Sequence, residues 1–302
     1  MLGTVTVGTT SSATLSATGG VPPYRWSATG LPAGITLSPA GVLSGSANQP
    51  GTFTLFVTVT DSNGVSATGS FSATFVLPPN PPVLIGGPEI SGPATQPRVQ
   101  VTLASPYPLD VNATLTLSFT PDSGPDDPAV QLSSGGRTVQ VLIPAGRTVG
   151  NTDVAIQTGT VSGLITISVR LEAANANVTP TPTPTRTIRI EPAAPTVSAL
   201  QARRTSSGFD VIVTGFSSSR EVRQAIFRFT PVAGAQLQTT ELTLPVDAAF
   251  SRWYQDPASA VFGSQFALSQ SFTSSDAASI ASVTVILVNQ QGQSAPVSAQ
   301  LQ

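Results

Sequence analysis

Three residue types that carry much of protein chemistry are missing from this sequence. Its 302 residues include no cysteine, no histidine and no lysine, so all 13 basic residues are arginine. Without cysteine there is no disulfide, no thiolate nucleophile and no thiolate-bound zinc. Without histidine there is no imidazole base, and without lysine there is no Schiff base, no P-loop and no Lys–Asn isopeptide cross-link. We therefore expect a protein that is not an enzyme and that needs no cofactor.

Charge is also scarce. Charged residues make up 9% of the chain, the net charge is −2 and the pI is about 5.0. The few arginines are scattered, so we do not expect nucleic acid as a partner, because phosphate binding needs a clustered positive face. No apolar run approaches the roughly 18 residues of a membrane span, and the start of the chain lacks the features of a signal peptide. We expect a segment of a longer extracellular or cell-surface protein, with signal and anchor outside this segment.

Proline clusters suggest where the chain divides into modules. Leu77–Pro82 and Glu191–Pro195 cannot pair as central strands, because proline has no amide donor, and both are expected to be stiff linkers. The run Thr179–Thr185 precedes a plausible strand and is placed inside the middle module as a polyproline-type loop. The predicted modules are 1–79, 80–194 and 195–302.

Hydrophobic residues alternate with polar ones along most of the chain. Phe53, Leu55, Val57 and Val59 alternate in this way, and Asn63-Gly64 then predicts a tight hairpin turn with two left-handed residues. The same period recurs in each module, with roughly seven short strands and turns every 8–12 residues or so. We predict an all-β chain of three tandem Ig-like or fibronectin III-like β-sandwich modules in an elongated array.

One short helix is expected within this β-rich chain. Phe250, Trp253 and Tyr254 are spaced as one helix face after Asp247, a candidate N-cap, so a helix is predicted near residues 247–255.

Four segments of the first module resemble a known family. They are Gly19–Ser27, Gly30–Leu37, Gly41–Gly45 and Val57–Gly64. Together they resemble the Ig or dystroglycan-type cadherin-like repeat of bacterial surface proteins, over about residues 19–71. The resemblance implies an extracellular, multi-repeat, non-catalytic spacer or adhesive module. The remainder resembles uncharacterised C-terminal regions of secreted bacterial Ig-like proteins, which imply no activity.

Two residues of this module carry further expectations. Trp26 is expected to fill the centre of the sandwich. Cadherins bind calcium between repeats through several acids, but this module has no Glu before Glu89 and only two charged residues, Arg25 and Asp61. We expect Asp61 to cap its turn and not to bind calcium.

The only acidic cluster lies in the middle module. Asp122, Asp126 and Asp127 offer three carboxylates within six residues, which are ligands of the kind that calcium prefers. The spacing does not fit an EF-hand, and the neighbouring prolines favour a solvated hairpin loop. The sequence leaves calcium binding and the plain loop as alternatives.

The third module holds an aromatic cluster with two interpretations. Trp253 and Tyr254, with Phe262 and Phe266, are a candidate sugar-stacking platform, because pyranose C–H faces pack on flat rings. The alternative is that they form the core of the module. Glycoside hydrolysis needs a pair of acids, and none of the 15 acids stands beside an aromatic-rich cleft signature; Asp256, next to Trp253 and Tyr254, is the best of these candidates.

Arginines gather before and along one predicted strand of this module. A patch of arginines would attract an anionic polysaccharide, and the candidates are Arg203, Arg204, Arg220, Arg223 and Arg228. The strand period places Arg220 and Arg228 on one face and Arg223 on the other, so the patch is split. A solvated edge that guards against strand pairing with another chain is the preferred interpretation.

Taken together, the sequence predicts a non-catalytic bacterial Ig-like protein that acts as a surface spacer or adhesive module. The expected partner is a cell-surface protein or polysaccharide, and we expect a monomer that does not span a membrane. The alternative is a carbohydrate-binding appendage of a secreted polysaccharide-degrading enzyme. A third interpretation is fibre assembly by exchange of edge strands.

Overall fold

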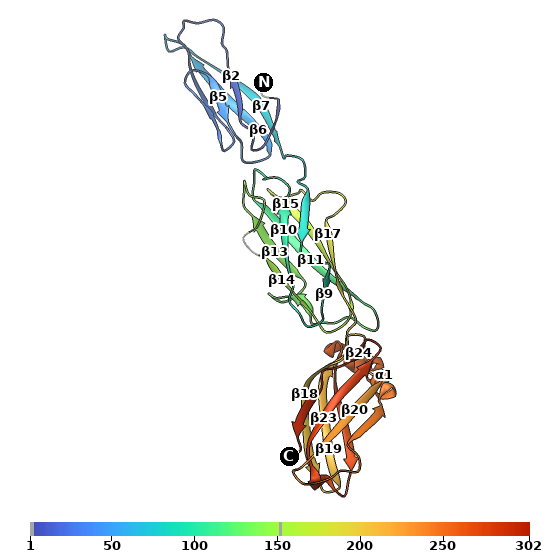
Figure 1. Ribbon diagram of the computed structural model, residues 1–302. Helices are drawn as coiled ribbons and strands as arrows, with labels where there is room; N and C mark the ends of the chain where they lie inside the picture. The colour runs from blue at the N-terminus through green and yellow to red at the C-terminus, as the bar shows by residue number, and fades with distance from the viewer. Residues whose placement is uncertain (1–2, 151–152) are drawn as a thin grey trace.

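The computed structural model describes residues 3–150 and 153–302. Figure 1 shows three β-rich bodies that follow one another along a line, with the N-terminus at one end and the third body at the other. Within these two ranges, helix is confined to short segments in the third body. The chain is thus an all-β, elongated array, as the alternation of apolar and polar residues predicts.

The first sandwich packs two sheets against each other. One sheet has the order β1-β7-β6-β3 and the other has the order β2-β5-β4. Strand β1 pairs with β7 in parallel, while β6 and β7 form a long antiparallel hairpin. The strands are β1 (Thr4–Thr6), β2 (Ser11–Thr14), β3 (Arg25–Thr29), β4 (Ile35–Leu37), β5 (Val42–Gly45), β6 (Gly51–Thr60) and β7 (Ser66–Val76).

The turn between β6 and β7 differs from the predicted two-residue hairpin. It spans residues 61–65, and only Gly64 of the predicted pair has a positive φ, +83°. The carboxylate of Asp61 closes the turn by accepting the amides of Asn63 and Val65, each at 2.9 Å. It also accepts the amide of Val21 at 3.1 Å, and these backbone hydrogen bonds, that of Val21 first, lower the pKa of Asp61. The expectation that Asp61 caps its turn is confirmed.

Trp26 does not fill the centre of the first sandwich. It lies half-buried on β3, an edge strand, and its indole covers Gly41. A Cβ at Gly41 would lie 2.8 Å from the indole, so glycine is required beneath the ring. The smaller residues Leu55, Val57 and Phe75 occupy the interior.

The second sandwich has the largest core of the three. Its sheets have the orders β12-β14-β10-β8 and β13-β11-β15-β17-β9, with β16 paired to β15. The Thr-Pro run lies between β16 and β17, and β17 pairs antiparallel with β15. The strands are β8 (Val83–Gly86), β9 (Ile90–Ser91), β10 (Arg98–Leu103), β11 (Val111–Pro121), β12 (Val130–Leu132), β13 (Thr138–Ile143), β14 (Val154–Thr158), β15 (Gly163–Ala173), β16 (Ala176–Asn177) and β17 (Thr185–Ile190).

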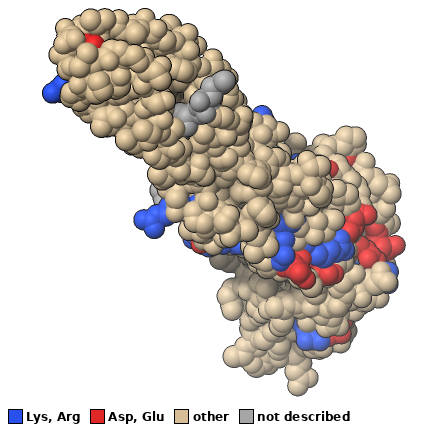
Figure 2. Space-filling view, turned by 90° about the horizontal axis from the view of Figure 1, so that it is seen from above, with Lys and Arg blue, Asp and Glu red and all other residues tan. Residues whose placement is uncertain are grey.

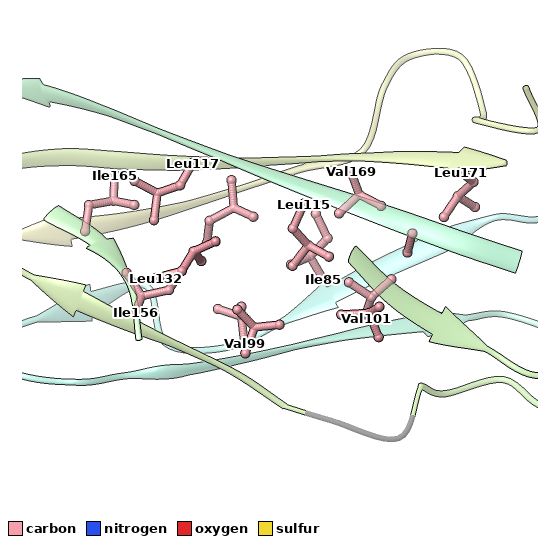
Figure 3. Packing of buried hydrophobic residues seen from close by; sticks show 14 of the residues in the cluster. Ile85, Val99, Val101, Leu115, Leu117, Leu132, Ile156, Ile165, Val169 and Leu171 are labelled. Atoms are coloured by element: carbon pink, nitrogen blue, oxygen red, sulfur yellow. The ribbon is translucent and has the colours of Figure 1, made fainter. Parts of the chain in front are cut away.

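Apolar residues from both sheets of the second sandwich interdigitate. Figure 3 shows Leu117, Ile165 and Val169 from one sheet directed towards Val99 and Ile156 from the other. Strand β11 buries alternate residues along its length, which is the period-two pattern of its sequence. The removal of these side chains from water is the main favourable contribution to the stability of this sandwich.

The third sandwich carries the helical segments. Its sheets have the orders β18-β19-β22 and β21-β20-β23-β24, with β25 paired to β23. The strands are β18 (Thr196–Thr205), β19 (Gly208–Phe216), β20 (Gln224–Pro231), β21 (Glu241–Pro245), β22 (Gln265–Thr273), β23 (Ile280–Asn289), β24 (Gly292–Gln293) and β25 (Val297–Gln300). The helices are α1 (Asp247–Gln255) and two short 3₁₀ segments, η1 (Pro257–Phe262) and η2 (Ala277–Ser279).

Helix α1 occupies the range in which the sequence places a short helix. Its cap position is Val246 and not Asp247, which lies in the first turn and makes no capping hydrogen bond. Phe250 and Tyr254 face the core, as residues four apart on a helix do.

Each sandwich has its own hydrophobic cluster, and these clusters draw on residues 7–75, 85–190 and 202–301. The module boundaries at residues 79 and 194 stay a prediction. Among the described residues, no helix is long and apolar enough to cross a membrane. Figure 2 shows that most of the visible surface is uncharged and that charged side chains gather in one part of it.

We expect Leu171→Ala to destabilise the second sandwich by about 2–5 kcal/mol, because Leu171 is fully buried and the substitution leaves a cavity. Leu164→Ala, on the same strand, is the matched control: Leu164 is 37% exposed, and we expect a cost below about 1 kcal/mol. Urea unfolding followed by circular dichroism measures both. Equal costs would contradict the assigned orientation of β15.

Candidate functional site

The acidic loop that follows β11 is held by two arginines of its own sandwich. Arg189 donates two hydrogen bonds to the carboxylate of Asp122, at 2.6 and 2.9 Å. Arg137 contacts Asp126 in the same two-pronged way, at 2.7 and 2.9 Å. The hydrogen bond from Arg189 lowers the pKa of Asp122. Such planar, two-bond pairs fix the geometry of the loop as well as its charge.

Asp127, the third acid of the loop, is buried and not solvated. Only 1% of its surface is exposed, and its carboxylate accepts hydrogen bonds from three backbone amides and one hydroxyl. The amide donors belong to Ala129, Thr160 and Val161, at 2.9, 2.7 and 3.1 Å. The interpretation of the whole loop as a solvated turn is therefore wrong for Asp127.

The three acids considered as calcium ligands bind different protein groups. Asp122 and Asp126 each face an arginine, while Asp127 faces amides. Within the described ranges, no group of three or more His, Cys, Asp or Glu is placed to hold a metal ion. The loop instead presents backbone carbonyl oxygens to the third sandwich.

Arg220 of the third sandwich enters this loop. Its Nη1 donates to the carbonyl oxygens of Ser123 and of Pro125, the latter at 2.7 Å, and its Nε donates to that of Gly263 at 3.2 Å. Arg220 is 8% exposed, so its interpretation as part of a solvated strand edge is wrong. Arg223 and Arg228 do lie at the surface, where they pair with Glu221 and Glu241.

The backbone turns sharply to aim Arg220. Its φ is +54°, in the left-handed region, and its amide bonds back to the carbonyl of Ser217 at 2.7 Å. Burial lowers the pKa of Arg220, while the nearby carboxylate of Asp127 acts in the opposite direction. A guanidinium stays protonated even so, because its ordinary pKa is above about 12. The junction thus contains a buried positive charge. Carbonyl oxygens accept from its Nη1 and Nε, the buried carboxylate of Asp127 favours it electrostatically, and its Nη2 has no hydrogen-bond partner among the described residues.

Two glycines make room for this contact. Gly124 has a φ of +70°, and a Cβ there would lie 2.6 Å from Nη1 of Arg220. Gly263, in the third sandwich, has a φ of +63°, and a Cβ there would lie 2.7 Å from the carboxyl group of Asp127. Both positions combine a left-handed backbone with a close approach, so a side chain would clash at either one.

Further hydrogen bonds join the second and third sandwiches. Ser264 bonds twice to Thr160, through its amide at 3.0 Å and its hydroxyl at 2.7 Å. The amide of Ser162 donates to the carbonyl of Ser218 at 2.9 Å. In the connecting segment, Ala193 accepts from Asn289 at 2.8 Å. We call this set of contacts around Arg220, Asp127, Thr160 and Ser264 the Arg220 junction.

The joint between the first and second sandwiches has fewer side-chain hydrogen bonds. Tyr107 donates to the carbonyl of Pro78 at 3.2 Å, and Asn80 donates to that of Thr179 at 2.8 Å. Gly8 packs against Pro108 so closely that a Cβ would lie 2.1 Å from that ring. No buried charge is present there among the described residues.

An apolar cleft of about 550 Å³ opens beside the Arg220 junction. We call it the junction cleft, because residues of both sandwiches line it. The lining residues are Ala94, Thr160, Ser198, Thr214, Gly215, Phe216, Trp253, Phe262, Gln265, Phe266 and Ala267.

The structure separates the two predicted sugar-binding residues. Trp253 lines the junction cleft, and its indole N–H donates to the carbonyl of Gln265 at 3.0 Å. Tyr254 is buried on the other side of helix α1, where its hydroxyl donates to Ser264 at 2.7 Å and burial raises its pKa. The ring beside Trp253 is that of Phe262, at a centroid distance of 5.9 Å and an angle of 34°. Of the predicted four aromatic residues, Trp253, Phe262 and Phe266 therefore meet at the cleft.

Asp256, the acid considered for glycoside hydrolysis, caps the segment η1. Its carboxylate accepts the amide of Ala258 at 2.9 Å. This hydrogen bond gives Asp256 a structural role as the N-cap of η1.

Sequence reasoning missed Thr160, Gly263 and Ser264. They are small residues whose backbone groups and hydroxyls make the contacts, and such residues are common throughout this chain. The sequence feature nearest to the junction is the run of three serines, Ser217 to Ser219, directly before Arg220.

One comparison with known protein families concerns the first sandwich. Residues 1–76 match the family described as Putative Ig domain. This match confirms the resemblance that residues 19–71 show and includes every strand of the first sandwich. No curated protein matches the chain.

Several solved structures match this chain, all at low identity and low TM-score. The FN1–FN3 domains of chicken CNTN1 are 10% identical, with 86% of this chain and 81% of that chain covered and a TM-score of 0.21. The insect immune protein hemolin is 10% identical, with 100% and 74% covered and a TM-score of 0.31. SGBP-B of the Bacteroides ovatus mixed-linkage glucan utilization locus, solved with a mixed-linkage heptasaccharide, is 12% identical, with 100% and 65% covered and a TM-score of 0.21. Scores this low carry no argument about the fold or the function of this chain.

We expect Gly263→Ala to weaken the Arg220 junction, because the new methyl group would displace the carboxylate of Asp127 from its donors. Gly234→Ala is the matched control: its φ is +85°, but a Cβ there meets no atom within 4 Å. Both variants carry the left-handed strain of about 1–2 kcal/mol. Differential scanning calorimetry should show Gly263→Ala lowering the Tm by at least about 4 °C more than the control. Equal shifts would show that Gly263 is not needed for close approach.

The contact of Asp122 with Arg189 predicts a pH dependence. Because folding lowers the pKa of Asp122, its contribution to stability is present above the unfolded pKa of about 4 and is lost as the pH falls through the folded value. We expect the Tm difference between wild type and Asp122→Asn to be largest near neutral pH and to vanish in strong acid. Asp276→Asn, which removes an exposed acid with no arginine partner among the described residues, serves as control. A Tm difference that grows on acidification would contradict the assignment.

Proposed function

We propose that this chain is a non-catalytic spacer of a bacterial surface protein, extracellular and monomeric, which holds an adhesive face at a fixed distance and orientation. Its expected partner is a cell-surface protein or polysaccharide. The observation that carries the proposal is the Arg220 junction, which locks two of the three sandwiches in one arrangement. The linear order of the sandwiches supports the same function (Figure 1).

The energetics of the junction favour a rigid joint. If the sandwiches shift without opening, the guanidinium stays shielded from water but loses its carbonyl partners, and an uncompensated buried ion typically costs several kcal/mol. Opening the joint would also separate Ser264 from Thr160 and expose Asp127. Polar contacts of this kind are directional, so they fix the angle between the sandwiches, whereas apolar burial alone would allow sliding.

The absence of catalysis is part of the proposal. No imidazole, thiol or amine side chain occurs in the sequence, and the acid nearest to the aromatic cluster caps a 3₁₀ segment. The remaining buried acid, Asp127, has its oxygens occupied by amide and hydroxyl donors. A general acid or base needs a free site facing a substrate.

A second function, as the carbohydrate-binding appendage of a polysaccharide-degrading enzyme, is favoured by one observation. The junction cleft exposes Trp253 and Phe262 side by side, and flat rings of this kind stack on pyranose sugars. The two functions are compatible, because a spacer with an adhesive face needs a binding site.

We expect Arg220→Asn to loosen the junction. Asparagine accepts positive φ more readily than most residues, so the substitution removes the guanidinium with little backbone strain. Arg223→Asn is the matched control, since Arg223 lies at the surface three residues away. Small-angle X-ray scattering of the full chain should fit one elongated shape, of monomer mass, for wild type and for the control.

Arg220→Asn should give a curve that only an ensemble of bent shapes fits, with a radius of gyration below that of wild type, because bending at a joint shortens a linear array. Identical curves for Arg220→Asn and wild type would show that Arg220 does not set the arrangement. A compact wild-type particle would refute the spacer.

A further inference from the structure

We propose that the junction cleft is a binding site for a neutral polysaccharide chain and that the second and third sandwiches each supply one of its walls. The inference rests on the adhesive function proposed above and names where that function resides. It differs from the pairing of Trp253 with Tyr254 that the sequence suggests, because Tyr254 is buried away from the cleft.

The cleft combines an aromatic surface with neutral polar groups. Trp253 is held in place by its hydrogen bond to Gln265, so its ring is fixed before any ligand arrives. Phe262 is 49% exposed beside it, which is unusual for phenylalanine and leaves a ring face available. Ser198, Thr214 and Gln265, whose side chains carry hydroxyl and amide groups, belong to the same lining. Pyranose sugars present this pair of properties, apolar C–H faces and hydroxyl edges.

The charge of the lining selects among ligands. Every residue that lines the cleft within the described part of the chain is neutral. An anionic polysaccharide would lose hydration there without gaining a positive partner, and a basic peptide would find no carboxylate. Arg220 is nearby, but it does not line the cleft: its Nη1 and Nε donate to backbone carbonyl oxygens, and its Nη2 is buried. A neutral glycan is the ligand that this lining accommodates.

The second sandwich contributes Ala94 and Thr160 to the cleft. Ala94 has a φ of +54°, and its amide donates to the carbonyl of Gly159 at 2.6 Å, which fixes the loop that carries it. Thr160 is bonded to Ser264 across the joint, so the two walls are tied together. The Arg220 junction therefore holds the cleft open at one width, which reduces the ordering cost of binding.

Tryptophan fluorescence tests the proposal. Trp26→Phe leaves Trp253 as the single tryptophan of the full chain. In this background we would titrate cellohexaose, mannohexaose, xylohexaose and maltohexaose, with hexagalacturonate as the anionic counterpart. We expect a saturable change in Trp253 emission with at least one neutral hexasaccharide and none with hexagalacturonate. Calorimetric titration of the unsubstituted chain should return the same Kd.

Two variants test the walls separately. Phe262→Ala removes the exposed ring, and Ala94→Asn fills the opposite wall with a residue that tolerates positive φ. Each should weaken binding at least tenfold, whereas Phe56→Ala, which removes a phenylalanine that is 58% exposed on the first sandwich, should leave the Kd unchanged. Circular dichroism confirms that each variant is folded.

Every outcome bears on the proposal. If no neutral hexasaccharide binds, or hexagalacturonate binds best, the glycan site is refuted. If Phe262→Ala weakens binding and Ala94→Asn does not, the second sandwich is not a wall. If the chain elutes as a dimer on size exclusion and Phe262→Ala makes it a monomer, the cleft is occupied by a second copy and the proposal fails. The shape that scattering gives for the wild type is independent of the sugar titrations, so a failed glycan site leaves the spacer to be judged separately.

Discussion

The hydrogen bonds that Arg220 donates to backbone carbonyl oxygens control how the second and third sandwiches sit together. Arg220 reaches the loop only because its own backbone is left-handed and because Gly124 has no side chain. The loop keeps its shape because Arg189 binds Asp122 and Arg137 binds Asp126. The width of the junction cleft depends on both, since its walls belong to the two bodies that Arg220 connects. Several of the few charged residues in this chain therefore lie at one joint.

The alternation of apolar and polar residues predicts much of the fold. It identifies β6 and β11 as half-buried strands, and both bury alternate residues. It fails at Trp26, because alternation tells which face a residue occupies but not whether its strand lies at an edge. The turn after β6 was also misjudged, since the side chain of Asp61 closes it and makes a five-residue connection stable.

The candidate site was less accessible to sequence reasoning. Helical spacing correctly grouped Phe250 with Tyr254, but neighbouring helix positions point about 100° apart, which separates Tyr254 from Trp253. The three clustered acids suggested either a calcium site or a solvated loop. The identity of their side chains says nothing about the backbone carbonyl oxygens between them. Arg220 donates to those carbonyls, and any residue type could have supplied them. Contacts of this kind emerge only when two separate bodies are placed together.

The first sandwich carries two charged residues, Arg25 and Asp61, and this scarcity of charge affects how its surface responds to salt. The attraction between ions in water fades over about 10 Å at 0.1 M salt and over about 3 Å at 1 M. A body with almost no ions has little to lose from that screening. Contacts made through its serine and threonine hydroxyls should therefore have nearly the same strength in fresh water and in brine. This end of the chain can keep its contacts across a wide range of salinities.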